Sequence, residues 1–179
     1  MTTVRLRPEG PADAAAIRQL VAGAFASPDT RLPAEVGLVE ALRYSDAWLP
    51  ELSMVAEAGG ELVGYALLTR VRVEPGGTPA LALGPVAVPP NRQGRGYGSD
   101  VVRAALDAAA ELGEHLVVVL GSPAYYRRFG FEPAARFELT SPWSGLGDPW
   151  QALVLPPAVG AAGPVPSGEV TFPPPWAQV

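Results

Sequence analysis

The segment from Ala80 to Gly121 constrains the fold of this 179-residue chain more than any other part of it. It begins with the apolar run ALALGPVAV, passes through the glycine-rich stretch QGRGYGS at residues 93–99, and ends with the apolar run HLVVVLG. Short apolar runs predict strands that are buried on both faces of a sheet. The apolar residues between the glycines and the second run predict one face of a helix: Val101, Val102, Ala105, Leu106, Ala109 and Leu112. A strand, a helix and a strand in this order predict a parallel pair of strands.

The first half of the chain predicts a hairpin and two helices. We expect a strand at residues 3–8, helices at 11–25 and 34–45, and strands at 52–60 and 61–74 that are joined through Gly59-Gly60. A Gly-Gly pair between two such runs is a strong hairpin signal, so this part of the sheet is antiparallel. The sequence therefore predicts an α/β protein, an α+β mixed sheet with helices packed on it, in one domain over residues 1–179.

The last third of the chain carries weaker signals. Residues 122–133 predict a short helical turn, and ARFELT at residues 135–140 resembles a strand. Residues 141–179 form a Pro/Gly-rich extension, for which we expect ordered loops or edge strands with the last few residues frayed.

Composition excludes several classes of function. A formal net charge of −5 argues against a nucleic-acid surface and suits a cationic small molecule or peptide better. The chain has no Cys, which excludes disulfides, thiolate metal sites and a cysteine nucleophile, and we expect no metal. Its one His, His115, lies at a predicted helix–strand junction, and we expect a surface residue there. With no membrane-length apolar stretch and no apolar block in MTTVRLRPEG, we expect a cytoplasmic protein without a membrane partner.

The glycine stretch suits a phosphate group. It lies between a strand and a helix, where peptide N–H groups converge at the helix N-terminus and the helix dipole favours an anion. Arg92 and Arg95 add two positive charges at the same rim. A dinucleotide fingerprint requires a Gly-x-Gly-x-x-Gly spacing that is absent, and the Gly-Lys-Ser/Thr of a triphosphate loop is absent too. A dinucleotide-dependent oxidoreductase is thus a distant alternative.

Two motifs resemble one family. Gln93, Gly96 and Gly98 satisfy the pattern Gln/Arg-x-x-Gly-x-Gly/Ala, which resembles the acetyl-CoA pyrophosphate loop of the GNAT family of N-acetyltransferases. One helix and one strand later, YYRRFGF resembles the tyrosine-bearing segment of that family. VRLRPEGPADAAAIRQLVAGAF is similar to its opening strand and helix, so the resemblance covers about residues 3–140. Within the family, the motifs look closest to the bacterial YhbS-like branch.

The resemblance implies an acetyl-CoA-dependent enzyme with helices on both faces of a mixed, splayed sheet. It places the pantetheine arm on the backbone of the strand at residues 80–88, where one N–H is the expected oxyanion donor. The residues that it implies for binding the cofactor are Val86, Ala87, Val88, Gln93, Gly94, Arg95, Gly96, Tyr97, Gly98 and Ser99. It also matches Tyr126 to the family tyrosine that protonates the departing thiolate. The alternative for Tyr125 and Tyr126 is a structural pair of aromatics on a short helix.

The general base is not identified by the sequence. The run ALALGPVAV contains no carboxylate, although many members of the family carry a Glu on or near this strand. Four carboxylates lie in segments that could reach the acceptor, and a solvated surface charge is the alternative for each: Glu35, Glu40, Asp46 and Glu57. Ser122 stands where related sequences often carry His, so a shared base or substrate does not follow.

The predicted function is acetyl transfer from acetyl-CoA to an amine of a small molecule, peptide or protein. A non-catalytic CoA-binding or regulatory domain is the alternative, which the missing base favours and Tyr126 disfavours. The acceptor site is expected to involve residues 26–44 and the C-terminal stretch, with Trp48, Trp143 and Trp150 either lining a pocket or covering the core. A homodimer is one oligomeric state to be tested.

Overall fold

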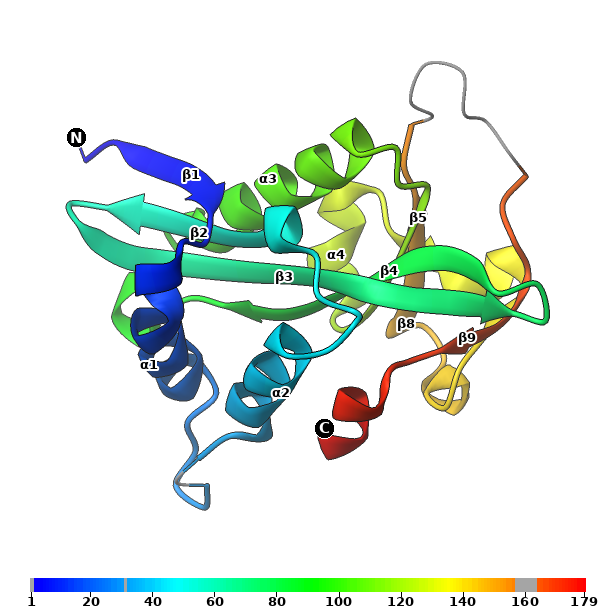
Figure 1. The fold of residues 1–179 in the computed structure, drawn as a ribbon, viewed down its shortest axis with the longest axis horizontal. Helices are drawn as coiled ribbons and strands as arrows, with labels where there is room; N and C mark the ends of the chain where they lie inside the picture. The colour runs from blue at the N-terminus through cyan, green and yellow to red at the C-terminus, as the bar shows by residue number, and fades with distance from the viewer. Residues whose placement is uncertain (1, 31, 157–163) are drawn as a thin grey trace. The chain divides into compact units, whose positions relative to one another are not determined.

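A computed structural model of the protein describes residues 2–30, 32–156 and 164–179. The chain, drawn as a ribbon in Figure 1, divides into two compact units. The N-terminal unit comprises Met1–Leu68, Gly84–Ala108 and Pro174–Val179, and the C-terminal unit comprises Thr69–Leu83 and Ala109–Pro173. Strands β3 (Glu61–Glu74) and β4 (Thr78–Ala87) and helix α3 (Tyr97–Glu111) each contribute residues to both units.

β1 (Val4–Pro8), β2 (Ser53–Ala58) and the first part of β3 pair antiparallel in the N-terminal unit, which also contains the end of β4. β1 pairs with β2, and β2 pairs with the first part of β3. Gly59 and Gly60 turn the chain between β2 and β3 with φ angles of 60° and 80°. Residues without a side chain adopt such angles readily, so the predicted hairpin is confirmed together with its physical reason.

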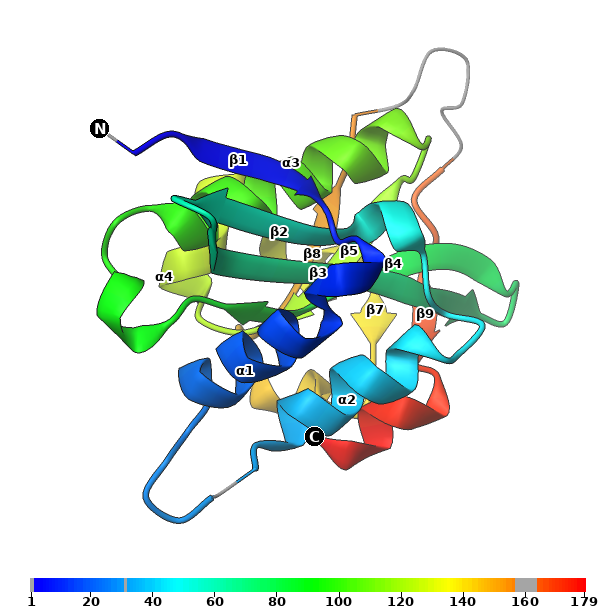
Figure 2. The ribbon, with the colours of Figure 1, turned by 60° about the vertical axis from the view of Figure 1, so that its left-hand side comes forward.

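Helices cover both faces of this sheet (Figure 2). α1 (Ala14–Ala24) and α2 (Ala34–Arg43) pack with Tyr65 of β3 in one apolar cluster. Side chains alternate between faces along a strand, so Gly64 faces away from Tyr65. A Cβ on Gly64 would lie 3.4 Å from the carbonyl oxygen of Tyr97, which places the start of α3 on that second face. The buried residues of the cluster are Ile17, Leu20, Val21, Val36, Leu38, Val39, Leu42, Ala47, Val55, Tyr65, Leu67 and Ala87.

The C-terminal unit contains a mixed sheet in the order β3-β4-β5-β8-β6. β5 (Leu116–Leu120) runs parallel to β4, and their register covers Leu81–Leu83 of β4. β8 (Trp150–Val154) runs antiparallel to β5, and β6 (Glu132–Pro133) runs antiparallel to β8. The predicted parallel pair and the predicted mixed sheet with helices are confirmed.

Two short strands complete the C-terminal unit. β9 (Gly168–Thr171) pairs antiparallel with the end of β3 and parallel with β7 (Leu139–Thr140). The remaining helices are short: η1 (Pro11–Asp13), η2 (Pro50–Leu52), η3 (Pro90–Arg92), α4 (Pro123–Tyr126), η4 (Arg127–Phe129), η5 (Ala134–Phe137), η6 (Ser144–Leu146) and η7 (Pro174–Gln178). None of the helices in the described part of the chain combines the length and apolarity needed to span a bilayer.

Two predictions for the last third of the chain are wrong. The strand expected at residues 135–140 is mostly the turn η5, because Glu138 takes a left-handed φ of 55° and leaves only two residues for β7. The expectation of edge strands fails for β8, which lies between β5 and β6 in the sheet. Its hydrogen bonds on both sides explain why an apparently weak segment, WQALV, is ordered and buried.

The helix and the C-terminus also differ from expectation. Leu112 lies beyond the end of α3 and is 52% exposed, whereas the other predicted face residues of α3 are buried. The residues before Val179 are not frayed, since η7 packs against α2. His115 is half-buried and its Nε2 atom is inaccessible to solvent, so the prediction that it is a surface residue is only partly correct.

Candidate functional site

The glycine stretch forms an open turn at the end of β4. Gly94 and Gly96 have φ angles of 76° and 87°, which side-chain-bearing residues rarely adopt. A Cβ at either position would meet no atom of the described chain within 4 Å. The backbone of this turn is therefore bare and faces open space, as a cradle for a ligand requires. Helix α3 begins at Tyr97, so Gly98 and Ser99 belong to its first turn and not to the preceding loop.

The N-terminus of α3 supplies hydrogen-bond donors to this cradle. The first bond of the helical series runs from the Asp100 N–H to the Gly96 carbonyl at 3.0 Å. The N–H groups of Gly96, Tyr97 and Gly98 precede it in the chain and have no acceptor within the helix. Together with the helix dipole, they form a site suited to the oxygens of a phosphate.

Two contacts hold the loop in place. Arg92 donates to the carboxylate of Glu61 at 2.8 Å, which ties η3 to the start of β3. Gln93 donates through its Nε2 atom to the carbonyl of Val88 at 3.2 Å, so its side chain turns back toward the end of β4. Arg95 is exposed at the rim of the turn.

Gly64 also contributes to the position of this site and was not predicted from the sequence. Its missing side chain lets the start of α3 approach β3 closely.

The three residues expected at the acyl end of the cofactor lie at the end of β4 and directly after it, and η3 separates them from the glycine turn. Val86 and Val88 are half-buried, whereas Ala87 is 2% exposed and packs in the apolar cluster with α1 and α2. Pro85 precedes them and has no N–H to donate. The N–H groups of Val86 and Ala87 are thus the first donors after the proline.

Tyr126 belongs to the C-terminal unit, where it lies in a cluster of aromatic rings. Its ring centroid is 5.0 Å from that of Tyr125, 6.2 Å from Phe129 and 5.7 Å from Phe131. Burial raises the pKa of the Tyr126 hydroxyl to about 12, with a smaller effect from Tyr125. The hydroxyl therefore carries its proton at neutral pH.

Gly121 allows the Tyr126 ring to take this position. A Cβ on Gly121 would lie 2.5 Å from Cε2 of Tyr126, closer than two atoms approach without a shift. The Gly121 carbonyl also accepts a hydrogen bond of 3.1 Å from the buried Gln151 side chain. Ser122 is exposed and begins the short helix α4.

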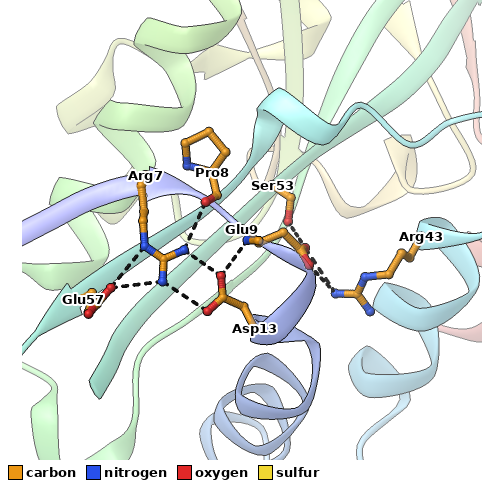
Figure 3. Close-up of polar contacts among 8 residues, drawn as sticks. Arg7, Pro8, Glu9, Asp13, Arg43, Ser53 and Glu57 are labelled. Atoms are coloured by element: carbon orange, nitrogen blue, oxygen red, sulfur yellow. Dashed lines mark hydrogen bonds and ion pairs between the residues drawn. The ribbon is translucent and has the colours of Figure 1, made fainter. Parts of the chain in front are cut away.

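A cleft of about 670 Å³ lies in the N-terminal unit beside Arg7. Arg7 donates to Asp13 at 2.6 Å and to Glu57 at 3.1 Å (Figure 3). The hydrogen bond with Asp13 raises the pKa of Arg7 and lowers that of the Asp13 carboxyl. The residues that line the cleft are Arg7, Asp13, Ala16, Gln19, Leu20, Glu57, Gly60, Glu61, Leu62 and Pro89.

A second polar network in the N-terminal unit was not predicted. Glu9, whose side chain is 9% exposed, accepts a hydrogen bond of 3.0 Å from Arg43 and a short one from Ser53 (Figure 3). Ser53 also contacts the Tyr65 hydroxyl at 2.9 Å, and burial raises the pKa of Tyr65. The guanidinium of Arg43 lies 5.2 Å from the Trp48 ring. Glu9 follows a proline at a strand end, and no spacing rule links it to Arg43.

The four carboxylates considered as bases have different surroundings. Glu57 pairs with Arg7, and Glu40 pairs with Arg18. Asp46 is exposed and Glu35 is half-buried. In the described part of the chain, no group of three or more His, Cys, Asp or Glu side chains is arranged to hold a metal ion.

The tryptophans expected near the acceptor are distributed over both units. Trp150 is 3% exposed and donates through its indole N–H to the Leu139 carbonyl at 3.0 Å, so it covers the core of the C-terminal unit. Trp143 stacks edge-on against Phe172 with ring centroids 4.7 Å apart. Trp48 is half-buried against the apolar cluster of the N-terminal unit.

Comparison with known sequences assigns this arrangement to a family. The sequence model of the acetyltransferase (GNAT) domain matches residues 5–134, which include the glycine turn and Tyr126. The chain belongs to the GNAT family. This GNAT enzyme is 34% identical over 146 residues to YhbS, an uncharacterized N-acetyltransferase of Escherichia coli K12, a match that covers 82% of the chain and 84% of YhbS. It is 35% identical over 125 residues to the E. coli protein YjhQ, which is also named an uncharacterized N-acetyltransferase.

Solved structures extend the likeness over nearly the whole GNAT chain. YhbS from E. coli in complex with CoA has a TM-score of 0.83 at 31% identity, with 99% of this chain and 93% of YhbS covered. A GNAT acetyltransferase from Brucella melitensis in complex with acetyl-CoA has a TM-score of 0.75 at 32% identity, with 97% and 98% covered. The predicted fold, family and acetyltransferase class are therefore confirmed.

Proposed function

We propose that this GNAT enzyme transfers the acetyl group of acetyl-CoA to a primary amine by direct attack of the amine on the thioester. The observation that carries the proposal is the bare glycine turn at the N-terminus of α3. Two glycines with positive φ angles, Gly94 and Gly96, open onto free space, and three successive backbone donors begin at Gly96. The co-substrate is consistent with the acetyl-CoA and CoA in the two similar structures.

Each cofactor residue has a proposed role. Gly94 and Gly96 keep the turn free of side chains, Gly98 does the same for the first turn of α3, and the N–H groups of Gly96, Tyr97 and Gly98 bind the pyrophosphate oxygens. Arg95, exposed at the rim, adds charge without closing the turn. Gln93 supports the loop through its bond to Val88, so its contribution to binding is indirect.

β4 is proposed to hold the acyl end of the cofactor. Backbone groups of Val86, Ala87 and Val88 pair with the pantetheine arm, and one N–H among them donates to the oxygen that gains charge as the amine attacks. Because Pro85 lacks an N–H, the donor is Val86 or a residue after it. A backbone donor needs no reorganisation during the reaction, which is the physical advantage of this arrangement.

Tyr126 is proposed as the acid of the reaction. As the C–N bond forms and the C–S bond breaks, the electron pair of the C–S bond goes to sulfur, and the Tyr126 hydroxyl gives its proton to the thiolate. The raised pKa of Tyr126 keeps the phenol protonated until that moment. Water then returns a proton to the phenolate.

The amine is proposed to react in its neutral form. Arg7 and Arg18 hold Glu57 and Glu40 in ion pairs, which leaves these carboxylates poorly placed to accept a proton from a substrate. The proton that the amine loses after the C–N bond forms then passes to water. Activity should accordingly rise with pH as the free acceptor amine deprotonates.

We also propose how many domains the chain forms and where in the cell it lies. Both units are proposed to form one acetyltransferase domain, because the GNAT match at residues 5–134 includes residues of each. A cytoplasmic location and a homodimer remain predictions, to be tested by fractionation and by light scattering.

Calorimetry and thiol release test the proposed function. The purified chain should bind acetyl-CoA and CoA, and it should release CoA thiol in the presence of primary amines. Because the chain has no Cys, a thiol reagent reports only the CoA that is formed. Binding without thiol release across a broad amine panel would identify a CoA-binding domain instead, and absence of binding would refute the cradle.

A further inference from the structure

The C-terminal turn η7 lies against α2 in the N-terminal unit (Figure 2). The side-chain oxygen of Gln178 is 2.9 Å from the position that a Cβ on Gly37 would occupy. The last residues of the chain are thus packed beside α2, one of the segments expected to shape the acceptor site.

Trp176 brings its indole ring from this turn onto β4. Its Cη2 atom lies 3.3 Å, and its Cζ3 atom 3.9 Å, from the position that a Cβ on Gly84 would occupy. Gly84 has a φ angle of 149°, which is strained for residues with a side chain, so the backbone here is bare beneath the ring. Trp176 as a whole residue is half-buried, and it packs against the apolar cluster.

The direction in which β4 runs puts Trp176 near the end of the proposed cofactor path where the thioester is expected. The cofactor contacts proposed above begin at the glycine turn and continue backwards along the strand through Val88 to Val86. The thioester is at the far end of the pantetheine arm, so it points toward Pro85 and Gly84. Trp176 covers Gly84, which lies at that end of the proposed cofactor path.

We propose that Trp176 determines acceptor specificity, as an aromatic wall beside the thioester that admits a primary amine on an unbranched methylene stem and excludes bulkier amines. The proposal rests on the proposed function. A methylene stem can lie flat against an indole ring and bury apolar surface there, whereas branching next to the nitrogen would collide with it. Both a lysine side chain and a simple alkylamine present such a stem.

The test compares amine selectivity among four proteins: the wild type, Trp176→Ala, Trp176→Phe and Phe25→Ala. Phe25 is the matched control, because it is also a half-buried aromatic residue against the same cluster. Thiol release from acetyl-CoA is measured with n-butylamine, cyclohexylamine, the lysine of an Nα-acetylated lysine amide, and water alone. Acetyl-CoA affinity is measured by calorimetry for each protein.

We expect Trp176→Ala to raise the kcat/KM for cyclohexylamine relative to n-butylamine on the order of tenfold, as pocket contacts of this size usually do. Hydrolysis without amine should also rise, while acetyl-CoA affinity changes less than about twofold, which is small against such pocket effects. The ratio for Trp176→Phe should fall between those of the wild type and Trp176→Ala, and Phe25→Ala should keep the wild-type ratio. The butylamine and lysine amide arms show whether a free amine or a peptide side chain is preferred.

An unchanged ratio and unchanged hydrolysis in an active Trp176→Ala protein would overturn this inference and leave the proposed function intact. The same shift in Phe25→Ala would also overturn it, because the effect would then be a general loosening of the cluster. A wild type that neither binds acetyl-CoA nor releases thiol refutes the proposed function, and the inference with it. If Trp176→Ala does not fold, the inference is tested by the kcat/KM for cyclohexylamine relative to n-butylamine in Trp176→Phe.

Discussion

The ring of Tyr126 fills the space that a side chain on Gly121 would need: its Cε2 atom is 2.5 Å from the position of that Cβ. The two residues stand five positions apart, at the end of β5 and in helix α4. Since Gly121 has an ordinary φ angle, the glycine is required by the close approach of the ring and not by backbone conformation. Gly121 is therefore a positioning residue for the proposed acid.

Replacing Gly121 with Ala should displace the Tyr126 ring and slow acetyl transfer. We expect kcat to fall about 10²-fold, the usual effect of a misplacement near 1 Å. Tyr126→Phe should reduce kcat about 10²- to 10³-fold by removing the proton donor. The double variant should be no slower than Tyr126→Phe alone, because both changes remove one function. Additive losses in kcat would show that Gly121 acts independently of Tyr126.

The raised pKa of Tyr126 predicts a specific loss of stability at alkaline pH. The folded protein holds the phenol proton up to a pKa of about 12, while the unfolded chain releases it near the ordinary value of 10.0. The stabilising contribution is thus complete below pH 10 and is lost as the pH rises toward 12, by about 2 kcal/mol. Urea unfolding at pH 9 and pH 11.5 measures this loss in the free energy of unfolding. The free energy of unfolding of Tyr126→Phe should fall by about 2 kcal/mol less than that of the wild type over this interval. Equal losses in the two proteins would contradict the assignment of the raised pKa to Tyr126.

The glycine cradle predicts different effects for two neighbouring residues. Gly96→Glu places a side chain and a negative charge where the turn requires a φ angle of 87°, so acetyl-CoA binding should be abolished. Arg95→Ala removes one exposed charge and should weaken binding about tenfold or less, as a single solvent-screened contact would. Calorimetric titration with acetyl-CoA measures both. Wild-type affinity in the Gly96 variant would refute the cradle.

The Glu9–Arg43 pair predicts a large effect on stability. Arg43→Met leaves the Glu9 carboxylate, 9% exposed, without its cationic partner, and should lower the free energy of unfolding by about 3 kcal/mol. Arg18→Met removes the exposed pair with Glu40 and is the matched control, with an expected change under about 1 kcal/mol. Urea denaturation of the two variants compares them. Equal losses would mean that burial of Glu9 does not decide the strength of its pair.

The sequence by itself determined the elements whose signals are local. Gly59-Gly60 predicted the hairpin, and the apolar runs around QGRGYGS predicted the parallel strands and the helix between them, because glycine conformation and side-chain periodicity are properties of short segments. The same kind of local signal predicted the glycine turn that precedes α3. It failed at residues 135–140, where a left-handed residue interrupts an alternating pattern.

The tertiary structure alone decided the contacts between residues far apart in the chain. Glu9 meets Arg43 and Ser53, and Trp176 reaches Gly84, across separations that no periodicity encodes. β8 is buried because strands pair with it on both sides, although its own sequence is short and bounded by prolines. Such contacts depend on which faces the folded chain brings together, and packing rather than local propensity selects them.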